Sequence, residues 1–104
     1  MPQLVALSLW HTVRMRVIIH PHARDHGLRD EQIVSAYETG YSSALVSHRD
    51  KDSEPVRWAT IGFDAEAREI ELVFVSLAGQ AVLVIHANYA TTAFKNEIRR
   101  ARNG

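Results

Sequence analysis

Residues 68–87, REIELVFVSLAGQAVLVIHA, contain two apolar runs of strand length around the break Leu77-Ala78-Gly79-Gln80. In the first run, apolar residues alternate with Glu69 and Glu71, so one face of this strand is predicted to be buried and the other solvated. The second run, residues 81–85, is apolar throughout and is therefore predicted to be buried on both faces. This stretch decides the fold, because it predicts a β-hairpin at the centre of an antiparallel sheet.

Two further segments, residues 29–39 and 90–102, have the spacing of apolar residues that is typical of amphipathic helices. The first is followed by Gly40, a common helix stop, and the second should bury Phe94 and Ile98. A central strand that is apolar on both faces needs a covering layer on each, and these helices can supply both layers. We therefore predict an α+β fold, a small antiparallel β-sheet flanked by helices.

The rest of the chain predicts shorter elements. Further strands are expected at residues 15–19, 41–47 and 56–63, where β-branched, aromatic and alternating residues gather. Residues 22–26 follow a proline and predict one short helical turn, which Gly27 would close in the left-handed conformation.

Length and composition limit the class of protein. At 104 residues the chain is predicted to be a single domain over 1–104, with residues 1–13 as either an extra N-terminal strand or a tail. It has no cysteine, which excludes disulfides and thiolate chemistry. Twelve basic and twelve acidic residues give zero net charge, which argues against nucleic-acid binding over the whole surface. No segment approaches the roughly 20 apolar residues of a membrane span, so we expect a cytoplasmic protein with no membrane partner.

Several short motifs occur in order along the chain. They are His22-Ala23-x-x-His26-Gly27-Leu28, Ile61-Gly62-x-Asp64, Glu71-Leu72-Val73 and Val84-Ile85-His86-Ala87. Together with a helix that carries Ile33 and Ala36-Tyr37, they resemble the BrnT-type toxins, a branch of the RelE-like ribonuclease superfamily found in bacterial toxin-antitoxin modules. The similarity covers about residues 20–95, most of the predicted domain.

The resemblance implies a RelE-like fold and the toxin component of a bacterial type II toxin-antitoxin system. Such a toxin would be an endoribonuclease that inhibits translation by cleaving mRNA or ribosome-associated RNA, with no metal or other cofactor. Its partner would be a cognate antitoxin, and it could form a homodimer. The chain departs from the family pattern at Asn88 and Thr91, where related toxins often carry cationic residues.

Histidines and cations are the side chains that could carry this chemistry. Histidine titrates near neutral pH and can exchange protons with a ribose hydroxyl. Two of the histidines lie four residues apart and would project from one face of a shared helical turn, where the histidine at the end of the central strand could join them. The basic residues would hold the phosphate. The candidate catalytic residues are His22, His86, His26, Arg57 and Lys95.

Three other interpretations stay open. In the first, the histidines have structural roles alone, capping the turn and ending the strand. They could instead bind zinc or nickel, with His20 in the set and Asp25 or Asp64 completing the shell, in a histidine-rich metal-binding domain. The chain could also be a catalytically silent toxin relative that acts as a protein-binding or regulatory module.

The last predicted helix has a basic face, formed by Lys95, Arg99, Arg100 and Arg102. These residues could hold the phosphates of an RNA strand. They could equally be a solvated face that favours the negative end of the helix dipole.

Overall fold

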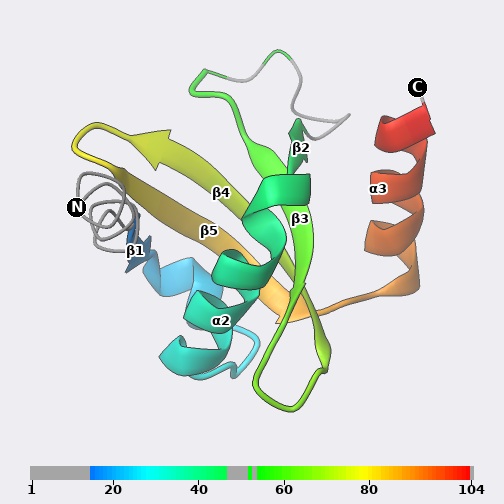
Figure 1. Cartoon of the computed structure of the whole chain (residues 1–104), viewed down its shortest axis with the longest axis horizontal. Coiled ribbons are helices and arrows are strands. Elements are labelled where there is room, and N and C mark those ends of the chain that lie inside the picture. The colour runs from blue at the N-terminus through cyan, green and yellow to red at the C-terminus, as the bar shows by residue number, and fades with distance from the viewer. Residues whose placement is uncertain (1–14, 47–51, 53, 104) are drawn as a thin grey trace, which may run out of the picture.

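The computed structural model describes residues 15–46, 52 and 54–103 (Figure 1). The predicted N-terminal strand or tail, residues 1–13, lies outside the described residues. The elements in chain order are β1 (Arg16–Ile19), the 3₁₀ turn η1 (Pro21–Arg24), α2 (Asp30–Gly40), the 3₁₀ turn η2 (Tyr41–Ser43), β2 (Leu45–Val46), β3 (Trp58–Phe63), β4 (Glu69–Leu77), β5 (Ala81–Tyr89) and α3 (Thr92–Asn103).

The strands of the described chain form one sheet in the order β1-β5-β4-β3-β2. The α+β class and the central position of the β4–β5 hairpin are confirmed. The prediction of an antiparallel sheet is wrong at one edge, because β1 runs parallel to β5. Parallel neighbouring strands need a long crossover connection, which here is the whole stretch of chain between β1 and β5. The pattern of side chains within a strand does not indicate which way the strand runs.

The β4–β5 hairpin turns at the predicted break. Gly79 and Gln80 both have a positive φ, 74° and 57°, and glycine adopts that conformation without a steric penalty. Pairing runs from Leu77 opposite Ala81 to Ile70 opposite Tyr89. It contains one irregularity, where the register shifts between Val73 and Phe74.

The larger part of the core lies between the sheet and α2. One face of β4 and β5 supplies fully buried residues to it, and α2 contributes a buried stripe at three-four spacing. The members from these elements are Ile33, Ala36, Tyr37, Ile70, Leu72, Phe74, Val82, Val84 and Ala87. The alternation in β4 therefore gives one buried face, as predicted.

The opposite face of the sheet is only partly covered. Phe94 and Ile98 of α3 are buried there against Ala59 of β3, as the helix pattern predicts. In Figure 1, α3 stands beside the sheet at the end opposite to β1. The prediction that Glu71 lies on a solvated face is wrong, because its side chain is buried among polar partners that strand alternation cannot reveal.

Two local predictions need correction. Residues 41–47 do not form one strand, because η2 extends the end of α2 over Tyr41–Ser43 and leaves only Leu45–Val46 as β2. The turn predicted over residues 22–26 is η1, which ends at Arg24 and so does not include His26. Gly27 does close this region with φ 80°.

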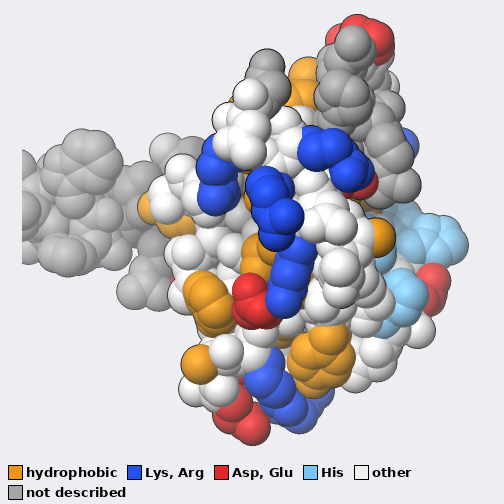
Figure 2. All heavy atoms as spheres, turned by 90° about the vertical axis from the view of Figure 1, so that its right-hand side faces the viewer, with side chains coloured by type: hydrophobic (Ala, Val, Ile, Leu, Met, Phe, Trp, Pro, Cys, Tyr) orange, Lys and Arg blue, Asp and Glu red, His pale blue; other side chains and the backbone are white. Residues whose placement is uncertain are grey.

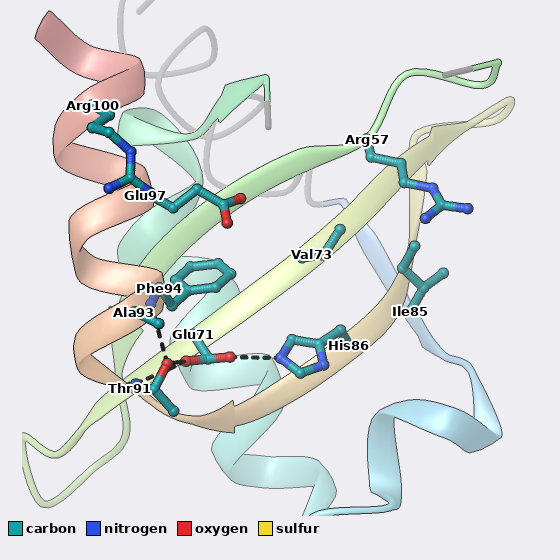
Figure 3. A pocket seen from close by; sticks show the side chains of 10 residues that line it. All are labelled: Arg57, Glu71, Val73, Ile85, His86, Thr91, Ala93, Phe94, Glu97 and Arg100. Atoms are coloured by element: carbon teal, nitrogen blue, oxygen red, sulfur yellow. Dashed lines mark hydrogen bonds and ion pairs between the residues drawn. The ribbon is translucent and has the colours of Figure 1, made fainter. Parts of the chain in front are cut away.

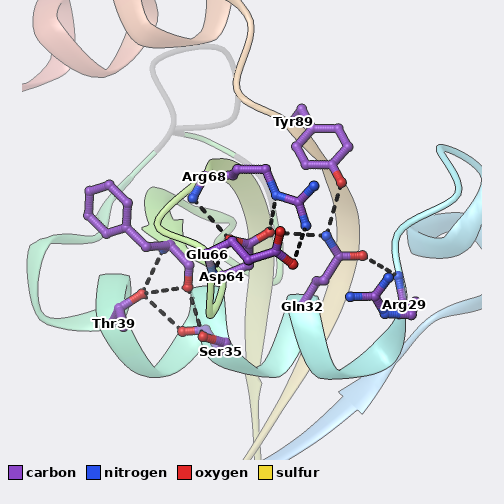
Figure 4. A network of polar contacts seen from close by, with 9 residues as sticks. Arg29, Gln32, Ser35, Thr39, Asp64, Glu66, Arg68 and Tyr89 are labelled. Atoms are coloured by element: carbon purple, nitrogen blue, oxygen red, sulfur yellow. Dashed lines mark hydrogen bonds and ion pairs between the residues drawn. The ribbon is translucent and has the colours of Figure 1, made fainter.

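A polar network fastens the β3–β4 turn to α2 (Figure 4). The Asp64 carboxylate accepts hydrogen bonds from the Arg68 side chain, 2.8 Å, and from Gln32, 3.2 Å. Gln32 also donates to the Tyr89 hydroxyl, 3.0 Å, which ties the end of β5 to the same point. Desolvation opposes ionisation of Asp64, but the hydrogen bonds outweigh it and lower its pKa to about 2.

The packing of α2 on β3 depends on the absence of a side chain at Gly62. A methyl group there would overlap the backbone of Ala36, whereas the same change at Gly27 meets no atom and costs only left-handed backbone strain. We expect Gly62→Ala to lower the free energy of unfolding by about 3 kcal/mol or more. Gly27→Ala should cost about 1–2 kcal/mol. Urea unfolding of both variants measures the two costs. Equal costs, or a larger cost for Gly27→Ala, would contradict the packing.

Candidate active site

A cleft of about 670 Å³ opens beside α3 on the sparsely covered face of the sheet (Figure 3). Its floor and one wall are apolar, formed by Val73, Ile85, Ala93 and Phe94. Its polar and charged side chains are Arg57, Glu71, His86, Thr91, Glu97 and Arg100. They come from β4, β5, α3 and the segments next to β3 and α3, so the cleft exists only once the sheet and α3 are assembled.

The side chain of His86 reaches this cleft because β5 is irregular beside it. Phe74 pairs with Val84 and the preceding Val73 pairs with His86, so Ile85 is one extra residue without a partner in β4. Such a bulge changes which side of the sheet the following residues face. Continued regular pairing would have placed His86 opposite a residue of the α2 core.

His86 is paired with a buried carboxylate. Its Nε2 lies 2.7 Å from Glu71 Oε2, and the two residues are diagonal neighbours on adjacent strands. The His86 side chain is 35% exposed and that of Glu71 is 6% exposed. The imidazole is therefore open to a bound molecule, while the carboxylate behind it is shielded from solvent.

The other oxygen of Glu71 is held by the start of α3. Glu71 Oε1 accepts hydrogen bonds from the Thr91 amide, 2.8 Å, and from the Thr91 hydroxyl, 2.9 Å. That hydroxyl also accepts a bond from the Phe94 amide, so Thr91 is the N-cap of α3. Burial opposes ionisation of Glu71, but the bonds from His86 and Thr91 outweigh it and hold its pKa below the ordinary value.

This geometry suits proton transfer. An ionised carboxylate behind an imidazole fixes the ring orientation and stabilises the imidazolium when the ring takes up a proton. Because Nε2 faces Glu71, exchange of a proton with a bound molecule falls to Nδ1 of His86. Figure 3 shows Arg57 and Arg100 on opposite sides of the cleft, where they can attract an anionic ligand.

The predicted candidates fall into two groups. His86 and Arg57 line the cleft, and His26 adjoins it, with its ring edge-on to that of His86 at 5.5 Å. His22 and Lys95 are not brought into the cleft. The His22 side chain is 77% exposed and lies 3.3 Å from the Asp25 carboxylate.

Lys95 lies on the other side of α3. Its ammonium group is 2.7 Å from Glu69, and both residues line a second cleft. The two histidines expected to share one turn diverge, because η1 ends before the second of them.

Four polar residues of the cleft were absent from the predicted set: Glu71, Thr91, Glu97 and Arg100. The strand pattern predicted a solvated side chain for Glu71, and Thr91 was noted only as a departure from the family pattern. Their proximity depends on the bulge and on the path of α3, for which the sequence has no local signal. Arg100 was placed only on the basic helix face.

Among residues 15–46, 52 and 54–103, no three histidine or acidic side chains are grouped so as to hold a metal ion. In the same part of the chain, no helix is long and apolar enough to cross a membrane.

The sequence matches no protein-family model, and no curated protein or solved structure is significantly similar to it.

The Glu71 interactions predict a pH-dependent contribution to stability. Since the folded pKa is depressed, the contribution is present above the unfolded value of about 4.3 and is lost as the pH falls through the lower folded value. We expect Glu71→Gln to cost about 1–3 kcal/mol at pH 7 and clearly less at pH 3. Urea unfolding at both pH values measures this difference.

Glu69→Gln is the matched control for this test. Glu69 lies two residues away on the same strand face and forms a partly exposed ion pair with Lys95. Its loss should cost less than about 1 kcal/mol at pH 7. A Glu71→Gln cost that is the same at pH 7 and pH 3 would contradict the assigned ionisation.

Proposed function

We propose that the protein is an endoribonuclease that needs no metal ion, and that it is the toxin of a bacterial toxin-antitoxin pair. The observation that carries the proposal is the His86–Glu71 pair in a cleft that also contains Arg57 and Arg100. RNA can be cleaved by its own 2′-hydroxyl, so the enzyme needs a base for that hydroxyl and positive charge for the phosphate. The cleft contains an imidazole that can act as the base and two cations, Arg57 and Arg100, beside the carboxylates of Glu71 and Glu97.

In the proposed reaction, His86 Nδ1 removes the proton of a 2′-hydroxyl while the 2′-oxygen attacks the adjacent phosphorus. The bond from phosphorus to the 5′-oxygen then breaks, leaving a 2′,3′-cyclic phosphate on one fragment. The departing 5′-oxygen takes up a proton, for which His26 provides a second imidazole, its ring 5.5 Å from that of His86. Glu71 stays ionised and stabilises the charged ring of His86.

Positive charge matters most in the transition state, because the pentavalent phosphorus carries more negative charge than the substrate. Arg57 and Arg100 supply cations from positions other than Asn88 and Thr91, where the resembled family often has them. Thr91 instead anchors Glu71. The apolar floor formed by Val73 and Ile85 offers a surface on which a base can lie.

The toxin assignment rests on the order of motifs that resembles the BrnT-type toxins. It assigns a cognate antitoxin as the protein partner, the cytoplasm as the location and mRNA or ribosome-associated RNA as the substrate. A homodimer is consistent with the same assignment.

A second candidate function is a catalytically silent toxin relative that binds a protein. The observation in its favour is that Glu71 accepts hydrogen bonds from both the amide and the hydroxyl of Thr91, as a carboxylate that only anchors α3 would do. In that case the His86 ring would complete the packing without any exchange of protons.

Cleavage of RNA in the presence of a chelator separates the two candidates. We expect the purified protein to cut single-stranded RNA into fragments that end in a 2′,3′-cyclic phosphate. His86→Ala should lower the rate by about 100-fold or more, because it removes the base. It should change the free energy of unfolding by only about 1–2 kcal/mol.

His20→Ala is the control, since it also removes an imidazole and His20 does not line the cleft. It should cut RNA at the wild-type rate. Expression of the wild type in bacterial cells should arrest growth, and His86→Ala should relieve the arrest. Intact RNA with folded wild-type protein would favour the binding module, and growth arrest unchanged by His86→Ala would remove His86 from the mechanism.

A further inference from the structure

A second cleft, of about 310 Å³, lies on the other side of α3. Among the residues that line it are Phe63, Glu69, Lys95, Ile98, Arg99 and Arg102. Glu69 and Glu71 are two residues apart in β4, so their side chains leave the same face of the sheet. The second cleft therefore shares a face of the sheet with the candidate active site, and α3 separates the two.

The wall of this cleft on α3 is strongly basic. Lys95, Arg99 and Arg102 follow one another at intervals of four and three residues and so form one stripe along the helix. Glu69 contributes one negative charge and pairs with Lys95 at 2.7 Å. The charges of Arg99 and Arg102 remain in excess, and Figure 2 shows lysine and arginine side chains gathered along this side of the molecule.

An aromatic ring lies in the same cleft. Phe63, the last residue of β3, is 44% exposed although it lines the cleft beside the apolar Ile98. The dipole of α3 accounts for basic residues near its C-terminus, but it does not account for an exposed phenyl ring beside them. Cations together with an exposed ring form the usual binding surface for single-stranded nucleic acid, since phosphates contact the cations and bases stack on the ring.

We propose that the second cleft binds the part of a single-stranded RNA that extends beyond the candidate active site. Its phosphates would contact Arg99 and Arg102, and one base would stack on Phe63. This inference rests on the proposed function, because it extends the same substrate across α3. A helix is about 10–12 Å across, so only a strand of several nucleotides reaches both clefts.

The test measures RNA binding by fluorescence anisotropy as a function of salt concentration. The protein carries His86→Ala, so that the RNA is not cleaved, and the probe is a labelled single strand of about ten nucleotides. Adding Arg99→Gln and Arg102→Gln should reduce the slope of log affinity against log salt by about 1.4, the value for two lost phosphate contacts. The two substitutions should weaken binding about sevenfold more at 50 mM salt than at 200 mM salt.

Two controls separate specific contacts from a general loss of charge. Arg16→Gln with Arg29→Gln removes the same charge from exposed residues outside both clefts and should change the slope much less. Phe63→Leu should weaken binding by about tenfold without changing the slope, because stacking releases no counterions.

The inference is overturned if the Arg99 and Arg102 substitutions act no more strongly than the Arg16 and Arg29 control. It is also overturned if poly-glutamate, a probe for an acidic protein partner, binds the same stripe and the RNA does not. Active wild-type enzyme with either result would leave the proposed function intact. A smaller salt slope in the Arg99 and Arg102 variant, together with no RNA cleavage by the wild type, would support the second cleft as an RNA site. It would remove only the catalytic assignment.

Discussion

The site depends on one extra residue in β5. Between the pairs Phe74–Val84 and Val73–His86, β5 contains Ile85 without a counterpart in β4. Before this point Val82 and Val84 face the α2 core, and after it Ala87 does, so the spacing of core residues lengthens by one. His86 consequently lies on the α3 side, next to Glu71. A local break in strand pairing thus converts a core position into a cleft position without disturbing the core on either side.

The second dependence is electrostatic. A carboxylate as buried as that of Glu71 is tolerated when its oxygens are hydrogen bonded. Here one oxygen faces His86, and the other accepts hydrogen bonds from Thr91, the residue before α3. The same carboxylate therefore orients the imidazole and fixes the position of α3, which forms one wall of each cleft. Thr91 carries both connections, since its hydroxyl donates to Glu71 and caps the helix.

The sequence predicted the fold class, the central hairpin and both long helices, because these depend on local periodicity and on turn residues such as Gly79. The parallel pairing of β1 could not be predicted, since it depends on how distant segments are arranged. The contact of His26 with His86 followed from expecting the last strand beside the first turn, but the end of η1 at Arg24 directed His22 elsewhere. Glu71 was missed because alternation alone assigns acidic residues to solvent, and only the bulge and α3 together bury it.

The position of the proton on the neutral His86 ring is tested most directly by nitrogen NMR of labelled protein. With Glu71 ionised and accepting from Nε2, the neutral ring of His86 should carry its proton on Nε2 and leave Nδ1 unprotonated. The nitrogen chemical shifts of His86 above neutral pH should report that tautomer, and Glu71→Gln should weaken the preference. A ring protonated on Nδ1, or one that exchanges freely between the two tautomers in the wild type, would contradict the account.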